Sequence, residues 1–366
     1  MPLQAALHRC LAEDVPAASD LPPFDRSLVD GYAVRCADGP ALPLAGAVAM
    51  GRPAEPLPPG AAMAVPTGGM VPEGADAVVM QEEVRIQGGS VLLARRARPE
   101  ENIVRRGADA RAGAAALPAG RRIGPAEVAM LATVGATAVP VWPRPRIAVL
   151  STGDELVAPG APAAPGQVPD SNAPALCAAL RRDGAEPRFL GVVPDDRAAL
   201  EAALRGALDF DALLCSGGSS VGRHDFVPDV LAAVLGVPPL FSGIAIRPGR
   251  PTSAFVPRRG PWAVALPGHA VSALVVYELL VRDAVLALGG QRDPRPRGTA
   301  AARLGSAARA PADRDLYVRV RLEGGTAVPL AGPSATIGNL ARADGLVHVP
   351  AGTEAPAGAE VAVALL

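Results

Sequence analysis

Short apolar runs alternate with helix-like segments through the middle of the chain. Strands are predicted at 146–150, 188–193, 211–215 and 262–266, with another in "GIAIRPGRP" at 243–251. Helices are predicted up to Gly184, with Asp170 or Ser171 as cap, over 197–207, with Asp195 or Asp196 as cap, over 225–235 and over 269–288. Strands alternating with helices of this length predict βαβ units and a mainly parallel, doubly wound sheet.

The flanking regions show a different pattern. A short helix is expected over 3–12, a β-rich domain over 21–111, a helix over 125–134 and a strand at 137–142. The pattern returns to short strands and turns after 293. We therefore predict an α/β multidomain protein with four parts: 1–20 plus 112–144, a small helical linker domain; 21–111; 145–292, the doubly wound domain; and 293–366, a β-domain.

Composition excludes several classes. The 366 residues are 49% hydrophobic, which suits buried cores, and the net charge of −1 gives no basic excess for a nucleic-acid surface. All 35 basic residues are Arg, so Schiff-base chemistry and a P-loop lysine are excluded. The four Cys and four His have no zinc spacing. No signal peptide is visible, and Glu278, Arg282 and Asp283 interrupt the best membrane candidate, so we expect a cytoplasmic protein without a membrane span.

Four glycine-containing polar segments follow predicted strands. They are "STGDEL" (151–156), "CSGGSSVGRHD" (215–225), "RPGRP" (247–251) and "LPGHAVSA" (266–273). Ligands of open parallel sheets bind at the carboxyl ends of the strands, where Gly217 and Gly218 allow close backbone approach and helix starts favour oxyanions. Arg247 and Arg250 add forked cationic donors. Each segment alone could be an ordinary turn, but all four at one sheet edge predict an anion site.

A second polar cluster lies in the β-rich part. "FDRSLVDGYAVR" contains Asp25 and Asp30, "VPTGG" contains Thr67, and "NIVRRGADA" contains Arg105, Arg106 and Asp109. Asp and Gly are common turn formers, so from these residues alone solvated turns and a functional cluster are equally plausible.

The ordered set of segments resembles the MoeA-type molybdopterin molybdenumtransferases, the family that includes the gephyrin E domain. The matching segments are "PPFDRSLVDGYAVR", "PTGGMVPEGADAVVMQEE", "ENIVRRGAD", "AVLSTGDELV", "DSN", "SGGSSVGRHD", "IAIRPGRPT", "LPGHAVSA" and "GPSATIGNLARADGL". The resemblance covers the chain from about Leu11 onward. It implies that the doubly wound domain is similar to molybdopterin-adenylylating proteins and that 1–20 plus 112–144 serve dimerisation.

The resemblance also implies an activity. Relatives insert molybdate into adenylylated molybdopterin and release AMP with the support of Mg²⁺. It implies an elongated cytoplasmic homodimer whose cleft combines the doubly wound domain of one subunit with the β-rich domain of the other. Further partners would be a molybdopterin adenylyltransferase and apo-molybdoenzymes or cofactor-maturation proteins, with no nucleic acid and no membrane.

Site residues carry over from the family segment by segment. Asp30, Asp109, Glu155 and Asp225 match catalytic acidic positions, and Glu155 and Asp225 would hold Mg²⁺. Arg247 and Arg250 match two family lysines that suit molybdate. The remaining substrate-binding candidates are Thr67, Asp154, Ser216, Gly217, Gly218, Ser219, Ser220, Gly222, Pro267, Gly268, His269 and Ser334.

Two other functions fit parts of the sequence. A non-catalytic molybdopterin-binding scaffold or carrier would keep the fold without turnover, but retention of the four acidic residues speaks against it. An adenylyltransferase or pyrophosphatase would need only the central domain, so the flanking β-rich regions speak against that class.

Overall fold

The computed structural model describes residues 1–217, 226–292, 298–330, 332–333 and 336–366. The chain forms two compact units, Met1–Val141 and Trp142–Leu366, and each is described by itself. Within the described residues no helix is long and apolar enough to cross a bilayer.

One core of the first unit joins the two ends of its sequence. Ala6, Leu11, Ile123, Leu131 and Val139 are all buried together. The elements around this core are η1 (Leu3–Ala5), β1 (Val15–Pro16), β10 (Ala115–Leu117) and α1 (Pro125–Thr133). The predicted helix over 125–134 is thus confirmed to within one residue.

Two predictions for this core are wrong. Residues 3–12 form only the 3₁₀ turn η1, because His8 has a left-handed φ of +64° and its N–H donates to Ile123 O at 2.8 Å. Residues 137–142 form two isolated bridges, Pro2 with Ala138 and Leu11 with Val141, instead of a strand. In both places the backbone donors bond across the core rather than along a regular element.

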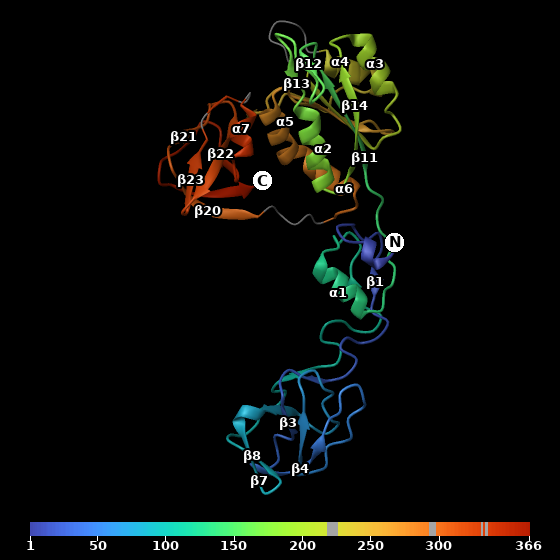
Figure 1. Ribbon diagram of the computed structural model, residues 1–366, viewed down its shortest axis with the longest axis vertical. Helices are drawn as coiled ribbons and strands as arrows, with labels where there is room; N and C mark the ends of the chain where they lie inside the picture. Colours follow the sequence, from blue (N-terminus) through green and yellow to red (C-terminus); the bar gives the residue numbers. More distant parts are fainter. Residues whose placement is uncertain (218–225, 293–297, 331, 334–335) are drawn as a thin grey trace. The chain divides into compact units, whose positions relative to one another are not determined.

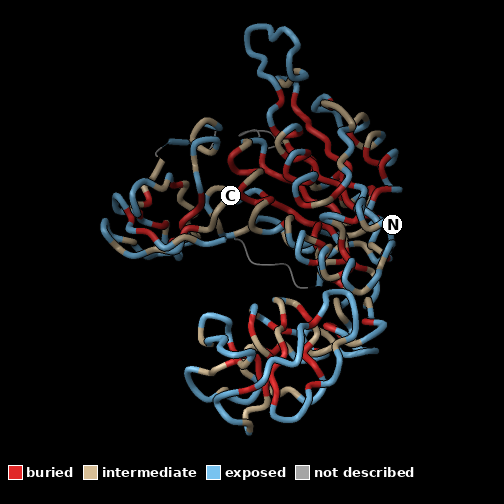
Figure 2. Tube along the Cα trace, turned by 60° about the horizontal axis from the view of Figure 1, so that its bottom comes forward, coloured by how far each residue is buried: buried red, intermediate tan, exposed pale blue. Residues whose placement is uncertain are grey.

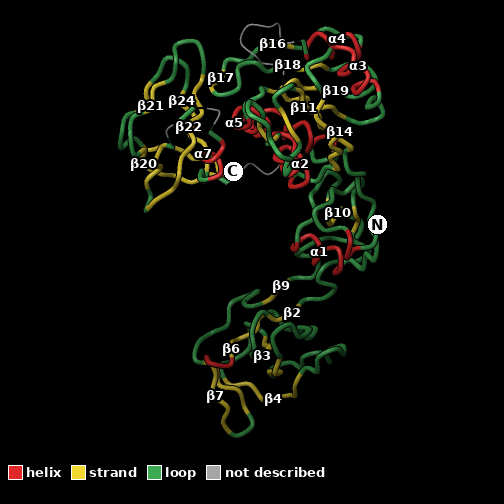
Figure 3. Tube along the Cα trace, turned by 45° about the horizontal axis from the view of Figure 1, so that its top comes forward, coloured by secondary structure: helices red, strands yellow, loops and turns green. Residues whose placement is uncertain are grey.

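The rest of the first unit is β-rich, as predicted, and Figure 3 shows mainly strands and loops there. A six-stranded sheet has the order β6-β3-β5-β4-β8-β7. Its strands are β3 (Gly31–Val34), β4 (Ala41–Ala47), β5 (Ala62–Val65), β6 (Ala77–Met80), β7 (Val84–Gln87) and β8 (Ser90–Leu93), with η2 (Gln81–Glu83) between β6 and β7. The short strands β2 (Arg26–Ser27) and β9 (Ile103–Val104) pair antiparallel.

The second unit contains the predicted doubly wound sheet. Its order is β14-β11-β15-β19-β18-β16. The strands are β11 (Arg146–Thr152), β14 (Glu186–Val193), β15 (Ala212–Gly217), β16 (Phe241–Ser242), β18 (Ser253–Phe255) and β19 (Trp262–Leu266). β14, β11, β15 and β19 are parallel to one another, whereas β18 pairs antiparallel with β19 and β16 pairs antiparallel with β18. Since β11 is flanked by β14 and β15, the chain reverses direction across the sheet at β11, which is where such folds form a ligand crevice.

Helices cover both faces of this sheet (Figure 1). One face packs against α2 (Asn172–Arg182) and residues 270–288, and the other against α3 (Arg197–Arg205) and α4 (Val227–Leu235). Figure 2 shows buried segments concentrated in this layer. The predicted caps are present: Asp170 Oδ1 accepts the N–H of Asn172 at 2.9 Å, and Asp196 Oδ1 accepts that of Ala199 at 2.7 Å.

The helix expected over 269–288 is not regular. It consists of α5 (Ala270–Val276), a π-helical turn η3 (Tyr277–Val281) and α6 (Arg282–Leu288). A short parallel pair, β12 (Leu156–Val157) with β13 (Val168–Pro169), closes the loop between β11 and α2.

A closed ring of strands forms the C-terminal part. β22 pairs with β23, β23 with β20, β20 with β26, β26 with β24, and β24 again with β22. The bounds are β20 (Thr299–Leu304), β22 (Asp315–Glu323), β23 (Thr326–Pro329), β24 (Gly345–Val349) and β26 (Glu360–Leu365); β21 (Ala308–Arg309), β25 (Glu354–Ala355) and α7 (Ile337–Ala341) lie between them.

The strand predicted in "GIAIRPGRP" belongs to a different sheet from the one expected. β17 (Ile246–Arg247) pairs parallel with β22 of the C-terminal ring. The expectation that all four polar segments end strands of one sheet is therefore wrong for the third segment. The two-residue pairing is long-range in sequence, and no local pattern indicates it.

Candidate anion-binding site

A cavity of about 1170 Å³ lies in the second unit, at the carboxyl ends of β11, β15 and β19. Three of the four predicted segments reach it from the doubly wound sheet, through Thr152, Gly153 and Glu155, through Gly217, and through Pro267, Gly268 and His269. The remaining segment, residues 247–251, reaches it from the end of β17, and parts of the C-terminal ring complete the wall. The cavity thus unites all four segments, although they come from two sheets.

Glycine backbones allow the strand ends to approach one another. Gly217 has a φ of +124°, and a Cβ there would overlap the Thr152 carbonyl oxygen. A Cβ on Gly268 would lie 3.7 Å from Gly217 Cα, so the last residue of β15 and the segment after β19 are in van der Waals contact. Beneath them the buried hydroxyls of Ser151 and Ser216 are 3.2 Å apart and hydrogen-bonded. Ser216 therefore supports the strand ends instead of lining the cavity.

Two carboxylates of the described residues line the cavity. Glu155 follows β11, and Asp195 follows β14. Asp195 Oδ1 accepts the Thr152 hydroxyl at 2.8 Å, and Asp154 Oδ1 accepts the N–H of Asp195 at 3.0 Å. Asp154, a predicted substrate-binding residue, thus holds the Asp195 loop. Asp195 was predicted as a possible helix cap, not as a site residue, although its place after a parallel strand could have indicated it.

Within the described ranges, five arginines line the same cavity. Arg247 and Arg250 are exposed, and in the part of the chain that the structure describes neither guanidinium makes an ion pair or a hydrogen bond, although the hydrogen bond from Arg314 and the charge of Arg250 both lower the pKa of Asp313. Arg309 is likewise unpaired among the described residues, whereas Arg314 pairs with Asp313 at 2.7 Å. The wall therefore carries an excess of positive charge over Glu155 and Asp195, which suits a polyanionic ligand.

Arg319 is the most deeply buried of these cations. Its Nη2 donates to the Gly332 carbonyl at 2.8 Å, while its Nη1 is buried and, within the described ranges, has no hydrogen-bond partner. Burial lowers the pKa of the guanidinium, which nevertheless stays charged at neutral pH. A buried donor without an acceptor is costly, and an anion in the cavity would relieve that cost. The sequence did not indicate three of the lining arginines, Arg309, Arg314 and Arg319. They belong to the C-terminal ring, and the pairing of β17 with β22 joins segments that are far apart in the sequence.

In the first unit the structure brings together Asp30 and Thr67. Asp30 Oδ1 accepts the Thr67 N–H at 2.7 Å and the Thr67 hydroxyl at 3.1 Å. Asp109 lies farther along, where its N–H donates to Leu21 O at 2.8 Å. Arg105 pairs with Asp25 at 2.5 Å, so this predicted loop is fixed by an ion pair and is not merely solvated.

Several predicted residues lie outside the described residues. They are Gly218, Ser219, Ser220, Gly222, Asp225 and Ser334. The catalytic and metal assignments of Asp225 therefore remain predictions from the sequence. Gly332 and Pro333, immediately before Ser334, do line the cavity.

Comparison with known proteins identifies the family. The model "MoeA N-terminal region (domain I and II)" matches residues 1–135, "Probable molybdopterin binding domain" matches 148–287, and "MoeA C-terminal region (domain IV)" matches 301–366. The chain belongs to the MoeA family. The resemblance drawn from the ordered motifs is thereby confirmed, as is the predicted α/β multidomain fold.

Similar MoeA-family proteins cover nearly all of the chain. A Mycobacterium tuberculosis protein named molybdopterin molybdenumtransferase 2 is 35% identical over 370 residues, covering 96% of this chain and 90% of the relative. The Haemophilus influenzae molybdopterin molybdenumtransferase is 39% identical over 296 residues, covering 79% of this chain and 72% of its own. A solved molybdopterin biosynthesis MoeA protein from Pyrococcus horikoshii has a TM-score of 0.82 at 28% identity, covering 100% of this chain and 94% of that one.

Proposed function

We propose that this MoeA-family chain is a molybdopterin molybdenumtransferase that inserts molybdate into adenylylated molybdopterin and releases AMP. The relatives named as such enzymes support the activity. The observation that carries the proposal to this chain is the cavity at the strand ends, where, among the residues that the structure describes, the guanidinium groups of Arg247, Arg250 and Arg309 and the Nη1 of Arg319 have no hydrogen-bond or ion-pair partner.

The charges of the cavity suit both substrates. Molybdate is a tetrahedral dianion, and adenylylated molybdopterin contains a diphosphate, so each needs cationic donors. In a balanced reaction two thiols of the dithiolene lose their protons, two Mo–S bonds form, and one molybdate oxygen leaves as water. One water cleaves the phosphoanhydride, so that AMP leaves. The arginines would hold the oxyanions in position and stabilise charge as these bonds change.

The described residues contain no group of three metal-ligating side chains, so a magnesium ion here would rest on two cavity carboxylates together with a ligand outside these residues and the substrate. Glu155 and Asp195 offer the hard oxygen donors that Mg²⁺ prefers, on a wall where a diphosphate would supply further oxygens. Asp225 is the additional ligand expected from the sequence. When bound, Mg²⁺ would polarise the phosphoanhydride oxygens. Asp154 would act by holding the Asp195 loop through the 3.0 Å hydrogen bond.

Assembly and location are part of the proposal. We expect a cytoplasmic homodimer in which Asp30, Thr67 and Asp109 of one subunit complete the site of the other, with an adenylyltransferase and apo-molybdoenzymes or cofactor-maturation proteins as partners. Light scattering gives the mass. Mixing an inactive Asp30→Ala variant with an inactive Arg250→Ala variant should restore activity in hetero-dimers if the site is shared.

The decisive experiment follows AMP release and transferable molybdenum with purified protein, adenylylated molybdopterin and Mg²⁺, with and without molybdate. We expect molybdate-dependent AMP release, and a loss of at least about tenfold in kcat/KM for Arg250→Ala, since a hydrogen-bonded charge contributes about 1.5–3 kcal/mol. Arg259→Ala removes an exposed arginine outside the cavity and should leave the rate unchanged. Tight pterin binding without either product would instead establish the non-catalytic carrier.

A further inference from the structure

The start of α2 is bonded directly to the wall of the cavity. Asn172, the first residue of α2, is 6% exposed, and its Nδ2 donates to the Gly268 carbonyl at 2.8 Å, across 96 residues of sequence. Gly268 lines the cavity between Pro267 and His269. The side chain of Asn172 thus sits behind the wall and fixes a carbonyl within it.

Asp170 holds Asn172 in place. Asp170 is 2% exposed, and its Oδ1 accepts the backbone N–H of Asn172 at 2.9 Å and that of Ala173 at 3.3 Å. Its own N–H donates to Val157 O at 2.8 Å, at the base of the loop that starts with Glu155. Asp170 thus fixes the backbone of Asn172, from which the amide reaches Gly268. Among the described residues the buried Asn172 Oδ1 has no hydrogen-bond partner, so the bond to the Gly268 carbonyl is what orients this amide.

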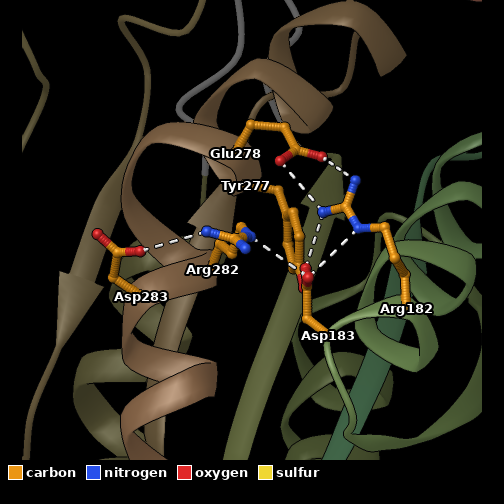
Figure 4. Close-up of polar contacts among 6 residues, drawn as sticks. All are labelled: Arg182, Asp183, Tyr277, Glu278, Arg282 and Asp283. Atoms are coloured by element: carbon orange, nitrogen blue, oxygen red, sulfur yellow. Dashed lines mark hydrogen bonds and ion pairs between the residues drawn. The ribbon is translucent and has the colours of Figure 1, made fainter. Parts of the chain in front are cut away.

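The same two helical segments are joined a second time, far from the cavity. Tyr277 Oη donates to Asp183 Oδ2 at 2.8 Å, and Asp183 also contacts Arg182 at 2.7 Å and Arg282 at 3.3 Å. Figure 4 shows Tyr277 and Arg282 from the π-turn region converging on Asp183 at the end of α2. Both ends of α2 are therefore bonded to the stretch from Gly268 to Arg282, and of these two contacts the one made by Asn172 reaches the cavity wall.

We propose that Asn172 is a positioning residue. Its amide holds the Gly268 carbonyl and thereby fixes the position of the Pro267–Gly268–His269 backbone in the cavity wall, as oxyanion binding requires. The effect is local because a Cβ on Gly268 would already lie within 3.7 Å of Gly217 Cα, so any displacement of the segment changes the gap between two strand ends. The role in turnover rests on the proposed molybdenum insertion, whereas the role in anion binding stands separately.

The test measures molybdate binding by calorimetry, and hydrogen exchange of the peptide 266–273, in the full-length protein. Asn172→Ala removes the donor, and Asn172→Asp keeps the shape but places an oxygen against the carbonyl. Loss of one such bond should raise the molybdate dissociation constant about two- to tenfold. Both variants should show faster exchange in that peptide, with Asn172→Asp affected at least as strongly as Asn172→Ala.

Tyr277→Phe is the matched control, because it removes the hydrogen bond at the far end of the same helical pair. It should leave the molybdate dissociation constant and the exchange of 266–273 at wild-type values. Equal changes in Tyr277→Phe and Asn172→Ala would overturn the proposal in favour of general helix packing. Unchanged molybdate binding in both Asn172 variants would also overturn it. If wild-type protein binds molybdate with this pattern but releases no AMP, the proposed activity fails while the positioning role stands.

Discussion

Gly217 ends β15 with a backbone conformation that favours glycine, directly against Thr152. Gly217→Ala should lower the free energy of unfolding by about 1–3 kcal/mol, since strain at a left-handed φ adds to the overlap with a carbonyl oxygen. It should also weaken molybdate binding. Urea unfolding and calorimetry measure the two effects. Gly191→Ala is the control, because Gly191 has a φ of +111° but open space around it, so the substitution adds backbone strain without a steric overlap. It should leave molybdate binding intact. An equal loss of molybdate binding in Gly217→Ala and Gly191→Ala would contradict the steric explanation.

Asp315 links acidity to stability at one position of the C-terminal ring. The 2.8 Å hydrogen bond with His348, whose ring also stacks on Tyr317, and the Ala351 N–H hold the pKa of Asp315 below its usual 3.8. A carboxyl whose pKa is lower in the folded state than in the unfolded state stabilises the fold at any pH above its unfolded-state pKa. This stabilisation is lost as the pH falls through the pKa of the folded state. Asp315→Asn should therefore be less stable than wild type at neutral pH, with the difference vanishing in acid. Urea unfolding across that range measures it, and a constant difference would contradict the linkage.

Residues at strand ends were predictable, and residues brought in by long-range pairing were not. Glu155, Gly217 and Gly268 come at the ends of strands whose apolar runs are visible in the sequence. Because the carboxyl ends of parallel strands meet at one edge of the sheet, the sequence predicts that these residues lie together. Arg319 lies on a strand of ordinary alternating sequence, and its guanidinium is placed by the carbonyl of Gly332, 13 residues further along the chain. Nothing in the local sequence distinguishes it from a surface arginine.

Among the elements, α3 depends on its cap. Asp196 accepts the Ala199 N–H at 2.7 Å, so Asp196→Ala should lower the free energy of unfolding by about 1 kcal/mol. Asp196→Ser keeps a capping oxygen and should restore most of the loss. Both variants should bind molybdate as wild type does, because Asp196 is not among the cavity-lining residues. Chemical denaturation separates the variants, and an unchanged stability in Asp196→Ala would show that the cap contributes nothing.

Elements were predicted well where their own side chains decide the structure. The parallel strands and the capped helices follow from apolar runs and from Asp170 and Asp196. The helix expected over 3–12 fails because the backbone donors of His8 and Leu11 bond to Ile123 and Arg121 instead. The sequence also did not predict the π-helical turn at Tyr277–Val281, since a single extra residue in a helical turn leaves the apolar periodicity almost unchanged.

At the scale of the whole molecule, the two compact units offer a direct spectroscopic test. Both tryptophans, Trp142 and Trp262, belong to the second unit. If the units unfold separately, tryptophan fluorescence should report one transition, while far-UV circular dichroism should show an additional one from the first unit. Superimposable curves would mean that the chain unfolds as one cooperative system. The finer division into four domains at 20, 111, 144 and 292 remains a prediction from the sequence.

The β17–β22 pairing has a consequence for how this protein can be rearranged. The strand precedes β18 and β19 in the chain, yet its hydrogen bonds belong to the ring that starts at Thr299. Arg247 is therefore carried by the central segment, although its strand pairs with Leu316 of the C-terminal ring. A chimera that exchanges the ring at residue 298 with that of another protein would replace the strand with which Ile246 and Arg247 pair, so a functional exchange must redesign residues 243–251 together with the ring.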